Sequence, residues 1–278
     1  MSNIKIVTDS ASDILELEGV DLAVAPLKVI SDEREFVDDA SLNVAEVSAY
    51  FAAYKGRSQT SCPNAADWID AFGDAEQVIC MTITSGLSGS YNAASVAAQI
   101  YEKEHAGRRV FVVDSLSAGP EISLLLYRCA EMVRHGVEFD HICENITKYK
   151  ETTGLLFMLK SLRNFANNGR VSPAVAKIAN VLGIRIVGKA SDEGTLEPTD
   201  KCRGAEKSLS AIVKRLKESG LKTGKVILAH CTNEPAAIRL KNMIEAELPD
   251  VTVRITVNLG LCSYYAEKGG LLVGFEKM

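Results

Sequence analysis

One short stretch combines glycines with hydroxyl side chains in a pattern that could bind an anion. It is Thr84-Ser-Gly-Leu-Ser-Gly-Ser90, which lies between an apolar run at 78–83 and an Ala-rich amphipathic run at 91–101. Glycines let the backbone approach a ligand closely, and the first N–H groups of a following helix have no intrahelical partner. The stretch has neither a Gly-Lys-Ser/Thr ending nor a G-x-G-x-x-G pattern, so no nucleotide is specified. It predicts a site for an acidic group that is bound without a lysine.

Polar residues also follow two other expected strands. Asp9 and Ser10 end the first β-rich run, and Asp114 and Ser115 end a later one. Since the carboxyl ends of parallel strands share one edge, we expect these residues to line up with 84–90. The two aspartates could serve an enzyme that acts on a small acid or a phosphate ester, together with the serine loops. Their distant positions and the lack of a nearby histidine favour loop-organising hydrogen bonds instead, and no metal site is expected.

A second group of hydroxyls precedes another expected helix. Ser58-Gln-Thr-Ser-Cys-Pro-Asn64 interrupts the helical spacing, which resumes at 65–72, so Pro63 is expected in the first turn of that helix. Thr60 and Ser61 could cap the helix, or they could face a ligand. The serines of the first stretch have the same two interpretations, and the residues alone leave both open.

The remaining patterns alternate between strands and helices, which indicates an α/β chain. A change in the sequence pattern near residue 152 predicts two domains, 1–152 and 153–278. Ser10-Ala-Ser-Asp13 has the spacing of a capping box and predicts a helix, whereas Pro26 predicts a sheet edge or a bend. We also expect a hairpin or loop at 31–39. Helices are expected at 43–54, 121–135, 173–182, 205–219 and 235–248, together with a helical stretch that ends at 165. Strands are expected at 154–159, 184–187, 196–198, 225–230, 251–257 and 270–275.

Composition narrows the class of protein. The chain has 278 residues, 47% of them hydrophobic, and a formal net charge of −5. The charge forms no basic stripe, which argues against a nucleic-acid partner. Seven cysteines at scattered spacings indicate reduced thiols. No apolar stretch approaches the ~18 residues of a membrane span, so a cytoplasmic protein without stable membrane insertion is expected, with a monomer as the default.

Six motifs together resemble the DegV family over nearly the whole chain. They occur in the family's order and at roughly its spacing: Thr8-Asp9-Ser10, Thr60-Ser61-Cys62-Pro63, Ser85-Gly-Leu-Ser-Gly-Ser-Tyr91, Val113-Asp114-Ser115, Asn168-Gly-Arg-Val171 and Lys201-Cys-Arg-Gly204. The resemblance implies an N-terminal, Rossmann-like domain with a parallel sheet and a C-terminal α/β domain with a mixed sheet. It further implies that one long-chain fatty acid is buried at the junction, with its acyl chain in an apolar tunnel.

The resemblance also implies roles for particular residues. Thr60 and Ser88 would bind the carboxylate, with Ser61 and Gly89 beside them. Two basic residues, Arg170 and Arg203, would face a fatty acid kinase subunit that brings the ATP. This chain would then be a binding protein with no catalytic residue and no cofactor, or a lipid sensor without a kinase partner.

One departure from the family concerns the carboxylate site. The family commonly has a histidine near the carboxylate, in a segment that here reads Gly260-Leu-Cys-Ser-Tyr-Tyr-Ala266 and contains none. Counting back from the final strand places Tyr265 at this position, whereas alignment on Gly260 places Cys262 there. A tyrosine hydroxyl could donate the same hydrogen bond, and a thiol would do so poorly.

Overall fold

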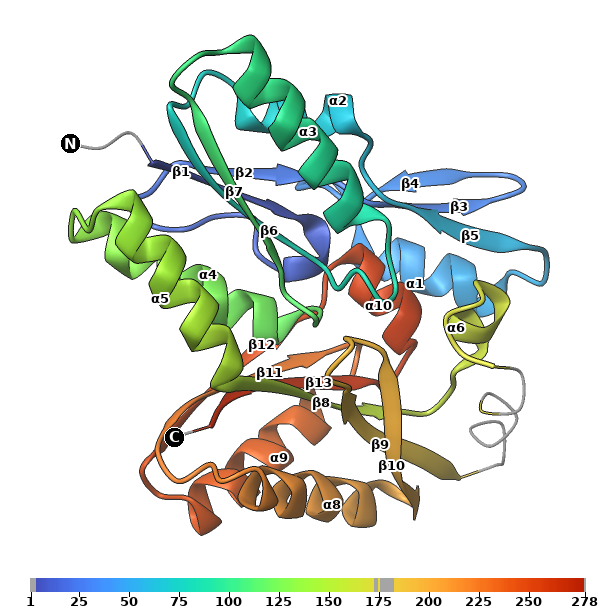
Figure 1. Cartoon of the computed structure of the whole chain (residues 1–278). Coiled ribbons are helices and arrows are strands. Elements are labelled where there is room, and N and C mark those ends of the chain that lie inside the picture. The colour runs from blue at the N-terminus through green and yellow to red at the C-terminus, as the bar shows by residue number, and fades with distance from the viewer. Residues whose placement is uncertain (1–3, 173–174, 176–182, 278) are drawn as a thin grey trace.

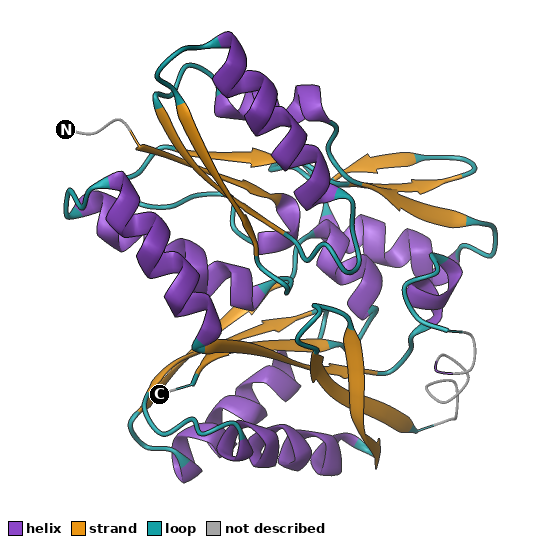
Figure 2. Cartoon of the chain, in the orientation of Figure 1, coloured by secondary structure: helices purple, strands orange, loops and turns teal. Residues whose placement is uncertain are grey.

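Layers of helix and sheet alternate through the molecule, as Figures 1 and 2 show. In this computed structural model the described residues are 4–172, 175 and 183–277. From the top of Figure 1 downwards, two helices, a parallel sheet, two more helices, a mixed sheet and a last pair of helices follow one another. The expected class is confirmed: a two-domain α/β protein with a parallel sheet in the N-terminal part and a mixed sheet in the C-terminal part.

The parallel sheet places three polar loops on one edge. Its strands are β1 (Ile4–Asp9), β2 (Leu22–Ala25), β6 (Gln77–Thr82) and β7 (Arg109–Asp114). They follow the order β2-β1-β6-β7, and all neighbours are parallel. The loops after β1, β6 and β7 therefore meet at one edge, as expected. Pro26 follows the edge strand β2, and the chain bends there into a second sheet, which also matches the expectation.

Helices cover both faces of this sheet. On one face lie α2 (Ala65–Phe72) and α3 (Ser90–Glu104); on the other lie α4 (Pro120–Arg134) and α5 (Phe139–Glu151). Trp68 and Tyr101 are buried in the first core, and Leu125 and Ile142 in the second. α4 also contacts the mixed sheet, so this helix lies between the two sheets.

The mixed sheet has six strands. They are β8 (Thr153–Leu159), β9 (Ile184–Ala190), β10 (Leu196–Arg203), β11 (Gly224–His230), β12 (Val251–Val257) and β13 (Leu271–Glu276). The order is β10-β9-β8-β13-β11-β12, and only the β11–β12 pair is parallel. Helices α8 (Ala205–Glu218) and α9 (Glu234–Glu247) cover the face that is turned away from α4.

A small antiparallel sheet lies beside the parallel sheet. Its strands are β3 (Lys28–Ser31), β4 (Glu35–Val37) and β5 (Ser58–Ser61), in the order β4-β3-β5. The β3–β4 pair is the hairpin expected at 31–39. Helices α1 (Val44–Ala53), α6 (Arg163–Asn167) and α10 (Gly260–Ala266) lie nearby. Because α10 packs against α1 and β3 of the N-terminal part, the domain boundary near residue 152 stays a prediction.

The helix expected to start at Ser10 is absent. The chain forms only a 3₁₀ turn at Ser10–Ser12, after which Asp13 adopts a left-handed conformation with φ of 56°. Both supposed capping side chains are used elsewhere: Ser10 Oγ accepts a hydrogen bond from Leu27 N at 3.0 Å, and Asp13 Oδ1 accepts one from Leu259 N at 2.7 Å. Distant partners therefore override the local capping pattern.

Other differences concern element boundaries. Pro63 is not in the helix, since α2 begins at Ala65 and the side chain of Asn64 caps its first turn. Residues 58–61 form a strand instead of an irregular break, and the helices α5 and α10 were not anticipated. The helix expected at 173–182 falls almost entirely on residues outside the described ranges.

The cysteines are free thiols, as expected, and five of the seven are buried. Within the residues that the structure describes, no helix combines the length and apolar character needed to cross a bilayer.

Candidate functional site

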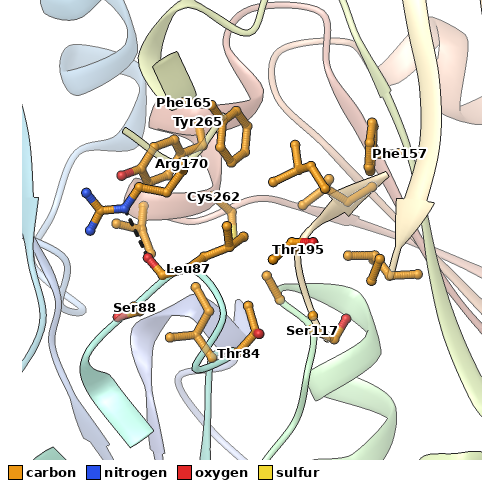
Figure 3. Close-up of a pocket in the computed structure, with 18 of the residues that line it drawn as sticks. Thr84, Leu87, Ser88, Ser117, Phe157, Phe165, Arg170, Thr195, Cys262 and Tyr265 are labelled. Atoms are coloured by element: carbon orange, nitrogen blue, oxygen red, sulfur yellow. Dashed lines mark hydrogen bonds between the residues drawn. The ribbon is translucent and has the colours of Figure 1, made fainter. Parts of the chain in front are cut away.

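A cavity of about 310 Å³ lies where the parallel sheet's polar edge faces the mixed sheet. Figure 3 shows Ser88, Arg170 and Tyr265 on one side of it and Phe157 and Thr195 on the other. Most of the wall is apolar and comes from both parts of the chain, and Ser88, Arg170 and Tyr265 form a polar end. We call the polar end the mouth.

Two tyrosines of α10 bind two hydroxyls of β5, and one of these pairs lies at the mouth. Thr60 Oγ1 and Tyr265 Oη are 2.8 Å apart, and Ser58 Oγ and Tyr264 Oη are 2.7 Å apart. Ser58 and Thr60 are two residues apart on a strand and therefore project from the same face. Burial raises the pKa of the Tyr265 hydroxyl, which therefore stays protonated and able to donate.

The stretch 84–90 forms the opposite side of the mouth. Ser88 and Gly89 both line the cavity, and Gly89 is the N-cap residue of α3. Ser90 N donates to Ser88 Oγ at 3.2 Å, so Ser88 partly caps the helix, as one of the two interpretations had it. The hydroxyl proton of Ser88 remains available for a ligand, because in this hydrogen bond the oxygen only accepts.

Cys262 and Ser61 lie at the wall in different ways. Cys262 lines the cavity, but its thiol is 3.5 Å from Ala11 O, and burial, reinforced by the carboxylate of Asp13, raises its pKa well above the ordinary value. Ser61 is exposed at the rim, where its hydroxyl bonds to the carbonyl of Cys62. Of the two candidates for the histidine's place, Tyr265 is the one that contacts Thr60.

Arg170 is half-buried at the mouth and not simply a surface residue. Its Nε donates to Leu87 O at 3.0 Å, and another guanidinium nitrogen donates to Asn168 O. The bond to Leu87 O links the C-terminal part to the turn before Ser88. Arg203, in contrast, is exposed near the end of β10 and is not among the residues that form the cavity wall.

The aspartates at the strand ends bind loop amides. Asp9 Oδ2 accepts from Ile83 N at 3.0 Å and from Ser90 Oγ at 2.6 Å, and burial raises the pKa of Asp9 to about 6. Asp114 Oδ1 accepts from the backbone amides that follow β6 and β7, each at 3.1 Å. Ser115 Oγ donates to the carbonyl of Ser117, two residues on. Each group is thus engaged within the loops, and no set of three metal-binding side chains occurs among the described residues.

On the side of the cavity away from Ser88 and Tyr265, an aromatic ring packs against a glycine. Phe157 of β8 pairs with Gly188 of β9, and a Cβ atom at position 188 would lie 2.3 Å from the ring's Cζ. The ring can therefore lie flat against the neighbouring strand only because residue 188 has no side chain. Phe157 also lines the cavity, so the position of its ring affects the space that is open to a ligand.

The turn between β9 and β10 lines the cavity through Gly194 and Thr195 and lies against the loops of the parallel sheet. A Cβ on Gly194 would lie 2.0 Å from Thr84 Oγ1 and 2.9 Å from Leu116 Cα, and a Cβ on Gly86 would lie 2.5 Å from Glu193 O. The glycine at position 86 therefore permits close approach of another part of the backbone. From the sequence, the glycines of this stretch were expected to allow close contact with a ligand.

Several wall residues were not anticipated from the sequence. Thr195 lies in the turn between β9 and β10, whereas Phe157 and Leu272 come from strands of the mixed sheet, and the sequence neighbours of these two carry no chemical motif. An alternation signal in the strands could have suggested their burial, but it could not have shown which face borders a cavity.

The fold and the site together define a class of protein: a two-domain α/β protein with a mostly apolar cavity and a hydroxyl-lined mouth at the junction of its sheets. The chain belongs to the DegV family. The model of that family, described as an uncharacterised protein, matches residues 3–276. A DegV domain-containing protein of Streptococcus pneumoniae is 38% identical over 276 residues, which are 98% of each chain.

Solved structures agree with this assignment. A DegV family protein from Eubacterium eligens loaded with heptadecanoic acid is 40% identical, with a TM-score of 0.96 over 99% of this chain and 100% of that one. The Fatty Acid Kinase (Fak) B3 protein of Streptococcus pneumoniae, loaded with linoleic acid, is 37% identical, with a TM-score of 0.97 over 99% of both chains.

Proposed function

We propose that this protein binds one long-chain fatty acid, with the carboxylate at the mouth and the acyl chain in the apolar part of the cavity. The observation that carries the proposal is the cavity's lining. Among the described residues that form it are hydroxyls, two cations and many apolar side chains, but no carboxylate. The two similar structures that are loaded with fatty acids support the same conclusion.

Hydroxyl donors suit a carboxylate that is enclosed by protein. A buried carboxylate without partners is costly, whereas Ser88 and one hydroxyl of the hydrogen-bonded pair Thr60 and Tyr265 could each donate a hydrogen bond to it. Transfer of the acyl chain contributes ~0.8 kcal/mol per buried CH₂, so the chain supplies most of the affinity and the mouth sets the orientation.

Lipid extraction of the purified protein, with mass spectrometry of both extract and intact complex, tests the proposal. We expect one fatty acid per chain. Its length should be on the order of 16–18 carbons, because each buried CH₂ contributes ~0.8 kcal/mol and tight binding requires many of them. A cavity that stays empty when delipidated protein is mixed with heptadecanoic acid would refute the proposal.

The substitution Ser88→Ala separates binding of the carboxylate from binding of the chain. Loss of one hydrogen bond to a charged group should weaken binding of heptadecanoic acid about 10-fold. Binding of the corresponding alcohol, 1-heptadecanol, should change much less, because it presents no charge. Isothermal titration of both ligands measures this difference. Ser85→Ala is the control, since Ser85 lies in the same turn but is exposed and outside the cavity wall; equal losses for acid and alcohol would contradict the assigned role.

The pair Phe157 and Gly188 should set the preferred chain length. Phe157→Ala removes the ring at the apolar end, so acids about two to four carbons longer should gain affinity at ~0.8 kcal/mol per additional buried CH₂. Gly188→Ala should act in the opposite direction, because the new methyl group pushes the ring into the cavity. Competition between acids of different length, with bound lipid identified by mass spectrometry, checks both. Shifts in the same direction would show that the ring does not end the cavity.

We further infer that the protein carries its ligand to a fatty acid kinase subunit and does not itself catalyse a reaction. The name of the similar pneumococcal protein supports this partner. Arg203, which is exposed, and Arg170, which holds the turn before Ser88, are the proposed contacts. Formation of acyl phosphate by the kinase should fall with Arg203→Ala, while binding of the acid stays unchanged. Unchanged formation of acyl phosphate would show that Arg203 does not contact the kinase. If no kinase uses the protein, it would be a lipid sensor instead. The contacts of Asp9 and Asp114 do not favour the enzyme alternative, so it is not proposed.

A further inference from the structure

The first turn of α10 has no cap in its own sequence. Its N-cap residue is Leu259, and no side chain nearby in the chain accepts its free amides. Two distant carboxyl groups do so instead. Asp13 Oδ1 accepts from Leu259 N at 2.7 Å, whereas Asp38 accepts from Gly260 N through Oδ1 and from Leu261 N through Oδ2, both at 2.8 Å. A single carboxyl group, that of Asp38, therefore binds two successive amides of this helix.

The fit between Asp38 and the helix is close. Asp38 is 1% exposed, and a Cβ added to Gly260 would lie 2.5 Å from Asp38 Oδ1 and 2.4 Å from Leu42 Cδ2. Any residue larger than glycine would push the helix away from the carboxyl group. The absence of a side chain at position 260 thus has a specific reason, which is the close approach of Asp38.

The same small sheet holds α10 at both ends. Asp38 directly follows β4, and its amide donates to Leu27 O at 2.9 Å. Thr60 lies on β5 and pairs with Val29 of β3, the strand between β4 and β5. The start of α10 is therefore fixed at one side of the sheet, and its Tyr265 reaches a hydroxyl on the other side.

The helix transmits the position of its first turn to the mouth. Leu261, whose amide binds Asp38, lies one helical turn before Tyr265, so the two side chains project from the same face. Both line the cavity. A rotation or slide of the first turn would move the hydroxyl of Tyr265 away from Thr60.

We propose that Asp38 is a positioning residue for the ligand: by binding the first amides of α10, it fixes Tyr265 against Thr60 at the mouth of the cavity. The inference rests on the proposed function, because the group that benefits is the bound carboxylate. Asp38 itself does not line the cavity and acts only through Tyr265.

A double-mutant cycle tests the proposal with heptadecanoic acid and delipidated full-length protein. Asp38→Asn keeps the shape but turns an NH₂ group towards an amide N–H, and Tyr265→Phe removes the hydroxyl. Each single variant should bind the acid about 10-fold more weakly, which is the effect of one lost hydrogen bond. The double variant should have the same affinity as the single variant that binds less tightly, because both substitutions act on the same contact. A purely structural role for Asp38 would give losses that add.

Controls keep the outcomes distinct. Asp39→Asn alters the adjacent carboxylate, which is exposed and accepts hydrogen bonds from Ser41, and the variant should bind like the wild type. If Asp38→Asn does not fold, Gly260→Ala displaces the same contact while leaving the carboxyl group in place, and the same cycle applies. In both Asp38→Asn and Gly260→Ala, hydrogen exchange of the α10 amides should be faster than in the wild type, whereas exchange in β11 should be unchanged. Unchanged affinity, or additive losses, would overturn the role of Asp38; failure of the wild-type protein to bind would overturn the proposed function instead.

Discussion

Gly194→Ala is expected to weaken binding of a long-chain fatty acid by about 100-fold, the equivalent of re-exposing three or four CH₂ groups at ~0.8 kcal/mol each. The new Cβ would lie 2.0 Å from Thr84 Oγ1 and 2.9 Å from the backbone of Leu116, which cannot move without disturbing the parallel sheet's edge. The turn that closes the cavity must therefore lift, and water enters along Thr195 and Leu196. Isothermal titration with heptadecanoic acid measures the loss.

The matched control is Gly136→Ala. Gly136 has a φ of 69° and Gly194 one of 70°, so both substitutions introduce similar backbone strain, but the space around Gly136 is open. Gly136→Ala should lower the free energy of unfolding by about 1–2 kcal/mol and leave affinity unchanged. Similar affinities for the two variants would mean that contact at the turn does not close the cavity.

The second large effect concerns pH, because buried carboxyl groups, among them Asp9 and Asp13, have raised pKa values. Burial raises the pKa of Asp13 to about 8 and that of Asp9 to about 6, from 3.8 in both cases. Below about pH 4 the folded and unfolded states both hold these protons. Above it, the unfolded chain releases them first, so the folded state loses stability as the pH rises, until each folded pKa has been passed.

Asp13→Asn should remove the larger part of this loss. For Asp13 alone, the free energy of unfolding should fall by up to about 5 kcal/mol between pH 4 and pH 9. Asparagine cannot ionise, yet it can still accept the hydrogen bond from Leu259 N through its oxygen. At pH 9 the variant should therefore be more stable than the wild type, whereas near pH 4 the two should be similar.

Denaturant unfolding at a series of pH values measures this difference. Asp39→Asn serves again as the control, because its carboxylate is exposed. Parallel profiles for Asp13→Asn and the wild type would show that Asp13 is ionised in the folded protein at neutral pH, contrary to the expectation.

The sequence was sufficient to predict features that depend on local patterns. The strand ends at Asp9 and Asp114 could be aligned because parallel strands share a carboxyl edge. The class of fold and the family followed from six short motifs in order. The stretch 84–90 could be recognised as part of a site because its glycines, hydroxyls and helix start are adjacent in the chain.

Features that depend on distant contacts were missed. α10 has no cap signal because Asp13 and Asp38, more than 200 positions away, bind its amides. Ser10 and Asp13 suggested a capping box for the same reason, since nothing local shows that their side chains are used elsewhere. β5 is mostly polar and forms a strand only because β3 pairs with it. α5 is different: Phe139, Ile142 and Ile146 are buried at helical spacing, so that signal was present in the sequence.

The bond between Thr60 and Tyr265 also has a consequence for how the protein folds. These residues are 205 positions apart, so the mouth requires the closure of a very long loop. Such contacts form late, because the chain entropy lost on closure must be compensated by structure that is already in place. A partly folded chain would contain both sheets and still be unable to hold a fatty acid. Since a ligand that binds only the complete fold stabilises only that state, bound lipid should slow unfolding without accelerating the earlier steps of folding.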